Sequence, residues 1–213
     1  MINAYGIWLT IILAIATYWA SRRLCSHTIS LNDIENMILI AAPATLIGAR
    51  VHHVITDWYL YSDNIRSTLY VWNGGAGLWG GVLLGFTSVV IYCVYRGIAI
   101  TSLLQSVAVP LFFVFSIGRF ANVFNHELLP YAYYESFVSF NILLLIMALE
   151  RILTIRKYSI FFISLILYAA TRLVLEFVRL EPRYGLFTVN QYVSVFAIFL
   201  LLVTWRYIHF RNR

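Results

Sequence analysis

Long apolar runs separated by short polar breaks constrain this chain more than any other feature. A run of about 18 or more apolar residues is long enough to cross a bilayer as a helix. With 62% hydrophobic and 11% charged residues, the 213-residue chain is predicted to be an all-α integral membrane protein with one domain, residues 1–213. It is expected to form a bundle of seven transmembrane helices, at about residues 4–21, 37–57, 76–95, 101–121, 135–153, 158–178 and 188–207.

The basic residues predict how these helices are oriented, because Lys and Arg concentrate in cytoplasmic loops. If the N-terminus lies outside, the cytoplasmic loops hold nine basic residues and the outer loops hold two. We therefore expect an outside N-terminus and a cytoplasmic C-terminus. Arg22 and Arg23 follow the first run instead of preceding it, so that run is expected to be a retained helix and not a signal peptide. The net charge of +6 is assigned to these loops, and no nucleic-acid partner is predicted.

Aromatic residues gather near the predicted outer ends of the helices, where such side chains commonly anchor a protein at the bilayer surface. We expect this interfacial role for Trp58, Tyr59, Tyr61, Tyr70, Trp72, Tyr131, Tyr133, Tyr134 and Tyr184.

The second and third runs carry packing signals. Asn32 and Glu35 have the spacing of a capping box at the start of a helix. Glycines 77, 81 and 85 recur every fourth residue and predict a bare face that packs closely on another helix. Gly74 and Gly75 precede that face and serve either a turn or the close approach of a ligand. The neighbouring residues His52 and His53 point about 100° apart on a helix, so no metal site is predicted there.

Charged residues inside the apolar runs are the main functional signal, because they are costly in a membrane and usually serve a site. Arg119 ends the fourth run, and Arg172, Glu176 and Arg179 share one helix face in the outer half of the sixth. An Arg172–Glu176 ion pair accounts for part of this pattern but leaves arginines in surplus, with Arg50 among them. Arginine is well suited to phosphate, so we predict a site for a lipid phosphate at the outer leaflet. A channel or a transporter is less well supported, because neither rings of equivalent charges nor internal repeats are evident.

The chain also resembles the prolipoprotein diacylglyceryl transferase family in ordered motifs along nearly its whole length. GRFANVFNHE at 118–127 resembles the signature motif of that family. The other matching segments are YG at 5–6, ASRR at 20–23, NDIENMI at 32–38, GAR at 48–50, WNGGAGLWGG at 72–81, P-x-x-x-YE at 130–135, RLVLEFVR at 172–179 and NQ at 190–191.

This resemblance implies a bacterial inner-membrane enzyme, with its active site toward the outer leaflet. It would transfer the diacylglyceryl group of phosphatidylglycerol to the lipobox cysteine thiol of a prolipoprotein signal peptide, forming a thioether and releasing glycerol phosphate. No metal or soluble cofactor is expected. The predicted catalytic residues are Arg119, Glu127, Arg172 and Glu176. The predicted phosphatidylglycerol-binding residues are Arg50, Arg119, Asn122, Asn125, Glu135, Arg172, Arg179, Tyr5, Gly74 and Gly75.

The chain departs from the family pattern at two positions. Trp79 stands where the family usually has a histidine that has been proposed to act as a base, and tryptophan cannot accept a proton. His52, His53, His126 or a carboxylate would then take the proton, or the reaction needs no side-chain acceptor. In the fourth run, Ser106 aligns with a common aspartate of the family.

The segment between Glu127 and Pro130 is much shorter than the periplasmic insertion of typical family members, which indicates a compact version of the enzyme. Because Trp79 replaces the histidine, a second hypothesis is a phospholipid-binding membrane protein that has lost its catalytic activity. A third is a related transferase that uses a different acceptor.

Overall fold

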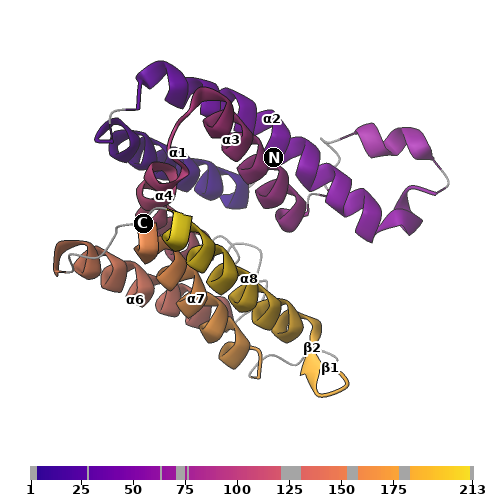
Figure 1. Cartoon of the computed structure of the whole chain (residues 1–213). Helices are drawn as coiled ribbons and strands as arrows, with labels where there is room; N and C mark the ends of the chain where they lie inside the picture. The colour runs from indigo at the N-terminus through magenta and orange to yellow at the C-terminus, as the bar shows by residue number, and fades with distance from the viewer. Residues whose placement is uncertain are drawn as a thin grey trace. The chain divides into compact units, whose positions relative to one another are not determined.

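The structure is a computed structural model of the whole chain, and it describes residues 4–27, 29–62, 64–70, 75, 77–120, 131–152, 158–177 and 183–211. These ranges are helical apart from turns, two short 3₁₀ helices and one small hairpin (Figure 1). The α-helices are α1 (Ala4–Cys25), α2 (Leu31–Thr56), α3 (Leu78–Arg96), α4 (Ile100–Gly118), α6 (Tyr131–Ile152), α7 (Tyr158–Leu175) and α8 (Val189–Arg211). The 3₁₀ helices are Trp58–Leu60 and Ile65–Leu69, and the antiparallel hairpin pairs β1 (Arg183–Tyr184) with β2 (Phe187–Thr188).

The helices of the described ranges support a multi-pass membrane protein. Five of them, α2, α4, α6, α7 and α8, are long and apolar enough to cross a bilayer, and Gly80–Arg96 in α3 is a shorter apolar helix. In the most apolar part of α8 only 6% of the residues are buried within the protein, and Phe196 and Phe199 are among the exposed ones. Apolar side chains on the outside of a bundle are expected where lipid replaces water. The count of seven spans and the orientation stay predictions.

Contacts within the chain fall into two compact units. We call Met1–Arg23 with Thr101–Arg213 the core unit, and Leu24–Ile100 the arm unit. Each is described by itself.

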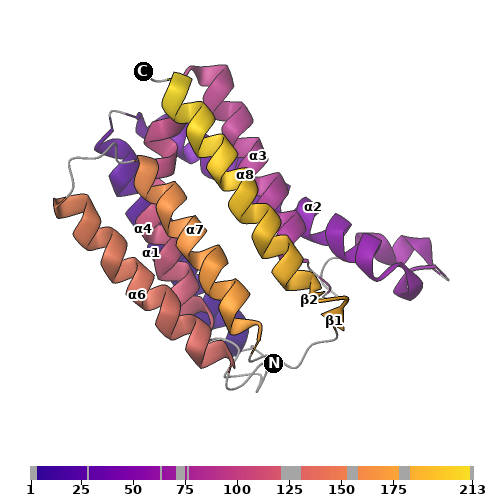
Figure 2. The same cartoon turned by 60° about the horizontal axis from the view of Figure 1, so that its bottom comes forward.

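The core unit is built on α4, α6 and α7, which lie side by side in Figure 2. Their buried side chains form one apolar cluster that includes Val109 and Phe112 from α4, Ile146 from α6 and Ile160 from α7. Trp8 ties α1 to this group, since its indole N–H donates to the carbonyl of Ile117 at 3.1 Å. Packing of this kind fixes the ends of α4, α6 and α7 relative to one another, and the candidate site lies at those ends.

An arginine joins three helices at the other end of the core unit. Arg23 of α1 pairs with Glu150 of α6 through both carboxylate oxygens. The same guanidinium donates to the carbonyls of Gln105 at 2.9 Å and Ser106 at 3.0 Å in α4. Ser106, the residue at the aligned aspartate position, is fully buried and donates its hydroxyl to the carbonyl of Ser102. One basic residue counted for orientation therefore has a structural role.

The arm unit is dominated by close packing of α2 on α3. A Cβ added to Gly80 would lie 2.2 Å from the carbonyl oxygen of Gly48, and one added to Gly48 would lie 2.3 Å from that of Gly80. A Cβ on Gly81 would lie 3.1 Å from the carbonyl oxygen of Thr45, and one on Gly85 would lie 2.2 Å from the Thr45 hydroxyl oxygen. The prediction of helix packing is therefore confirmed for Gly81 and Gly85, whereas Gly77 precedes α3 and faces the His52 side chain. Gly80 and Gly48 add a contact between small residues that the prediction did not include.

The first turn of α2 is capped by a residue other than the predicted pair. Ser30 has extended backbone angles and its hydroxyl oxygen accepts from the backbone N–H of Asp33 at 3.1 Å. Asn32 already lies inside the helix, so the predicted Asn32–Glu35 box is wrong. Asp33 also accepts from Tyr92 at 2.8 Å and from Arg96 at 2.9 Å, which fastens the start of α2 to the end of α3.

Candidate active site

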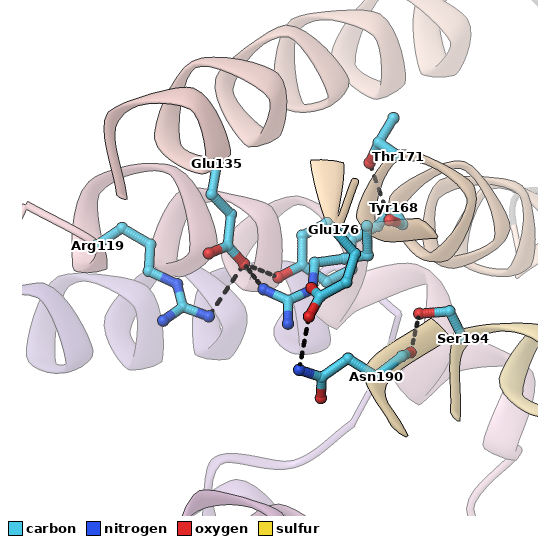
Figure 3. A network of polar contacts seen from close by, with 8 residues as sticks. Arg119, Glu135, Tyr168, Thr171, Glu176, Asn190 and Ser194 are labelled. Carbon is cyan, nitrogen blue, oxygen red and sulfur yellow. Dashed lines mark hydrogen bonds and ion pairs between the residues drawn. The ribbon is translucent and has the colours of Figure 1, made fainter. Parts of the chain in front are cut away.

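One carboxylate oxygen gathers three donors in the core unit (Figure 3). Oε1 of Glu135, in the first turns of α6, accepts from Arg119 Nη2 at 3.0 Å and from Arg172 Nη1 at 2.9 Å. Glu135 is only 1% exposed, whereas the side chains of Arg119 and Arg172 are 30% and 16% exposed. The buried carboxylate therefore holds the two more exposed guanidinium groups together. Glu135, Arg119 and Arg172 were all predicted site residues, and the structure brings them together from three separate segments of the sequence.

Tyr168 is the third donor, and sequence reasoning missed it. Its hydroxyl lies 2.6 Å from Glu135 Oε1. The ring stacks on Phe115 with centroids 4.9 Å apart and meets Phe112 edge-on, so packing between α4 and α7 sets its position. A tyrosine in an apolar run looks like a packing residue. The available signal is that Tyr168 precedes Arg172 by one helical turn and thus shares its face.

A second aromatic side chain supports Arg172. Its guanidinium carbon lies 5.7 Å from the ring centroid of Tyr131, a separation at which a cation and an aromatic face attract each other. Tyr131 is buried in the core unit. Its predicted role as an interfacial anchor is therefore wrong, since the ring packs against a charged side chain of the site.

Glu176 is the other buried carboxylate, and it does not complete the predicted helix face. Helix α7 ends at Leu175, and Glu176 lies in the turn that follows, with its backbone N–H still bonded to the carbonyl of Arg172. Its Oε1 accepts from Asn190 Nδ2 of α8 at 3.0 Å. Arg172 instead pairs across helices with Glu135, so the expected Arg172–Glu176 ion pair is replaced by two separate contacts.

The start of α8 is built so that Asn190 reaches Glu176. Thr188 and Gln191 form a capping box, because Gln191 N–H donates to Thr188 Oγ1 and Thr188 N–H donates to Gln191 Oε1. Gln191 Nε2 also donates to the carbonyl of Leu173 in the last turn of α7. These contacts give each residue of the Asn190–Gln191 pair a structural role. Gln191 attaches α8 to α7, and Asn190 holds the Glu176 carboxylate.

Arg50 belongs to the arm unit, where its guanidinium is largely used by the chain itself. It donates to the carbonyls of Thr68 at 2.8 Å, Gly75 at 3.0 Å, Ser67 at 2.7 Å and Tyr70 at 3.2 Å. Only 7% of the residue is exposed. Through these four carbonyls Arg50 holds residues 67–70 and Gly75, and its predicted contact with phosphatidylglycerol stays a prediction.

Tyr61 and His53 complete that arrangement. The Arg50 guanidinium carbon lies 5.0 Å from the centroid of the Tyr61 ring, and the Tyr61 hydroxyl lies 3.1 Å from His53 Nδ1. Tyr61 is buried, so its expected role as an interfacial anchor is wrong as well. Gly75 has a φ of 79°, which only glycine adopts freely, and its carbonyl accepts from Arg50. The role of the glycine doublet stays a prediction, because Gly74 lies outside the described residues.

Several predicted residues lie outside the described part of the chain. These are Gly74, Asn122, Asn125, Glu127 and Arg179, and His126 with them. Tyr5 belongs to α1 and Trp79 to the first turn of α3, each described as backbone only. Within the described ranges, no three His, Cys, Asp or Glu side chains are grouped to hold a metal ion.

The arrangement around Glu135 is suited to an anion. Two guanidinium groups against one carboxylate leave a formal charge of +1, and each guanidinium has five N–H donors, of which Glu135 takes one. Guanidinium groups pair with phosphate through two parallel hydrogen bonds. A phosphodiester with one negative charge would therefore neutralise the cluster.

Comparison with known proteins identifies the family of this chain. A family model described as prolipoprotein diacylglyceryl transferase matches residues 1–207. The chain belongs to this transferase family.

Individual relatives carry the same kind of name. A phosphatidylglycerol–prolipoprotein diacylglyceryl transferase of Streptococcus equi subsp. zooepidemicus (strain H70) is 28% identical over 227 residues, covering 93% of this chain and 88% of the relative. The protein of that name from Streptococcus suis (strain 05ZYH33) is 35% identical over 59% of this chain and 47% of its own length. The one from Rhodococcus jostii (strain RHA1) is 35% identical over 60% of this chain and 36% of its own length.

Proposed function

We propose that this protein transfers the diacylglyceryl group of phosphatidylglycerol to the lipobox cysteine of prolipoproteins, releasing glycerol phosphate. The observation that carries the proposal is the pair Arg119–Arg172, bridged by the buried Glu135 carboxylate in a chain of this family. We further propose that it acts in the bacterial cytoplasmic membrane, with the N-terminus outside and the site at the outer leaflet.

The arginine pair has two tasks in this reaction. In the ground state it binds the phosphodiester, whose acyl chains stay in the bilayer beside the apolar helices. During transfer the bond from the glyceryl carbon to the phosphate oxygen breaks, and the departing glycerol phosphate gains a second negative charge. Donors that are already in place stabilise such developing charge without reorganising. Both guanidinium groups donate to Glu135 Oε1, which keeps them in place, and the Tyr168 hydroxyl donates to the same oxygen and helps to fix its position.

The acceptor must be activated for the attack. Only the thiolate form of cysteine is a good nucleophile, and a free thiol with a pKa of about 8.5 is mostly protonated at neutral pH. The proposed site therefore needs a positive field or a proton acceptor close to the sulfur. The predicted residues Glu127, Asn122, Asn125 and Arg179 are proposed to complete the site.

Reconstitution with defined substrates tests the proposal. Purified protein is placed in phosphatidylglycerol vesicles with a lipobox peptide, and glycerol phosphate release and the thioether product are followed. Arg119→Ala is expected to lower turnover by about 10²–10³-fold, as found when one preorganised donor to a developing anion is removed. Arg66→Ala, an exposed arginine of the 3₁₀ helix Ile65–Leu69, is the matched control and should keep full activity.

The same assay separates the other two hypotheses. Trp79 favours a phospholipid-binding protein without transfer activity, which would bind phosphatidylglycerol yet release no glycerol phosphate. A transferase with another acceptor would release glycerol phosphate only when the lipobox peptide is replaced by that acceptor. Wild-type protein that is folded, binds the lipid and yields no product with the lipobox peptide would overturn the proposed function.

A further inference from the structure

Two buried carboxylates of the core unit differ in what surrounds them. Glu135 and Glu176 are each 1% exposed, and each has an Oε2 atom without a hydrogen-bond partner among the described residues. Their Oε1 atoms are used differently. Glu135 Oε1 holds two guanidinium groups and a phenol, whereas Glu176 Oε1 holds the neutral amide of Asn190 (Figure 3).

This difference decides which carboxylate is the better proton acceptor. A proton on Glu135 would cancel the charge that holds Arg119 and Arg172, so two ion pairs would be lost. A proton on Glu176 cancels no ion pair within the described part of the chain. Within the described residues, protonation of Glu176 therefore disrupts less of the structure than protonation of Glu135.

The position of Glu176 agrees with that role. Its backbone N–H bonds to the carbonyl of Arg172, so the carboxylate is carried one turn beyond an arginine of the anion site. Asn190 fixes one oxygen, and the capping box of Thr188 and Gln191 fixes Asn190. Because Asn190 binds only Oε1, the lone pairs of Oε2 are not used by any of the described residues.

Two of the three histidines that the sequence offered in place of Trp79, His52 and His53, are less suitable, and the third, His126, lies outside the described residues. His53 Nδ1 is bonded to the Tyr61 hydroxyl, and its Nε2 lies 3.6 Å from Asp57. His52 Nδ1 is buried against the backbone of Gly77, where even an added methyl group would come within 2.1 Å. A peptide thiol is larger than a methyl group and does not fit there.

From these contacts we infer that Glu176 is the general base that takes the thiol proton in this chain. The inference rests on the proposed transfer function. Glu176 Oε2 accepts the proton of the cysteine S–H, and the resulting thiolate attacks the glyceryl carbon that carries the phosphate. The S–C bond forms as the C–O bond breaks, and the electron pair leaves with the oxygen of glycerol phosphate. The proton stays on Glu176 until water removes it after product release.

A selenocysteine peptide provides the test, because a selenol is largely ionised at neutral pH and needs no base. Reconstituted wild-type protein, Glu176→Gln and Tyr168→Phe are each compared with the cysteine and the selenocysteine form of one lipobox peptide. Loss of a general base costs typically ~10²–10⁴-fold in rate, so Glu176→Gln should fall by at least about 100-fold with the cysteine peptide. With the selenocysteine peptide it should come within about tenfold of wild type, because the base no longer contributes.

Three measurements separate base catalysis from positioning. Tyr168→Phe disturbs the arginine pair and should lower the rate equally with both peptides. The Glu176→Gln rate with the cysteine peptide should rise about tenfold per pH unit below the thiol pKa of about 8.5, because solution then supplies the thiolate. Glu150→Gln removes a carboxylate near the other end of α6 and should keep the wild-type ratio of the two peptide rates.

The outcomes are distinguishable. No glycerol phosphate from wild-type protein with either peptide would overturn the proposed function itself. Active wild-type protein, with Glu176→Gln slowed by the same factor for both peptides, would overturn the base assignment and leave the transfer function standing.

Discussion

The hydroxyl of Tyr168 donates to the same oxygen of Glu135 that holds both arginines, at 2.6 Å. Tyr168→Phe removes this donor and keeps the ring that stacks on Phe115. A hydrogen bond to a charged group contributes about 1.5–3 kcal/mol, so we expect turnover to fall by at least about tenfold. The measurement is the rate of glycerol phosphate release at saturating phosphatidylglycerol. Unchanged turnover would show that the two arginines alone fix the carboxylate.

Glu135→Gln should weaken the core unit as well as the site. The change removes the carboxylate that pairs with both Arg119 and Arg172, so two cations face each other across a neutral amide. Breaking a buried ion pair costs about 3–5 kcal/mol, and thermal unfolding in detergent should begin at a clearly lower temperature. The double variant Glu135→Gln with Arg119→Gln removes the repulsion and should recover part of the loss. If the double variant is less stable than the single one, repulsion is not the cause.

Gly80→Ala should destabilise the arm unit more strongly than its size indicates. The added Cβ would lie 2.2 Å from the carbonyl oxygen of Gly48, and neither backbone has a side chain that can move away. Overpacking of this kind costs typically about 1–3 kcal/mol. Gly6→Ala is the matched control, because a Cβ there meets nothing within 4 Å and alanine favours a helix. The temperature of thermal unfolding should therefore fall for Gly80→Ala. For Gly6→Ala it should rise or stay unchanged.

Arg50→Lys distinguishes a structural role of Arg50 from lipid binding. Lysine keeps the charge but lacks the fork that reaches the carbonyls of Thr68, Gly75 and Ser67 together. We expect faster hydrogen exchange in residues 64–70 and easier proteolysis of that segment, both measurable without substrate. A variant with unchanged exchange and a raised KM for phosphatidylglycerol would instead show that Arg50 acts mainly on the lipid.

The helices themselves follow from the sequence because their length and apolar character are local properties. The predicted runs at 135–153 and 158–178 correspond to α6, Tyr131–Ile152, and α7, Tyr158–Leu175. The close packing of Gly81 and Gly85 was predictable for the same reason, since their spacing alone leaves a bare helix face.

The pairing of charges was not predictable, because it depends on which helix lies next to which. Spacing along α7 favoured an Arg172–Glu176 pair, yet the structure pairs Arg172 with Glu135 of the neighbouring helix α6. The helix also ends before Glu176, which gives that carboxylate to Asn190. Tyr61 and Tyr131 were assigned to the membrane surface for a similar reason, since a sequence does not show that an arginine lies over each ring.

The contact between Gly48 and Gly80 has a mechanical consequence. Most helix pairs touch through side chains that change rotamer, and this allows one helix to slide or rock on the other. Here backbone meets backbone, and such a contact has no soft degree of freedom. Helices α2 and α3 should therefore move as one stiff rod, and any displacement of the segment held by Arg50 would be transmitted along the full length of both.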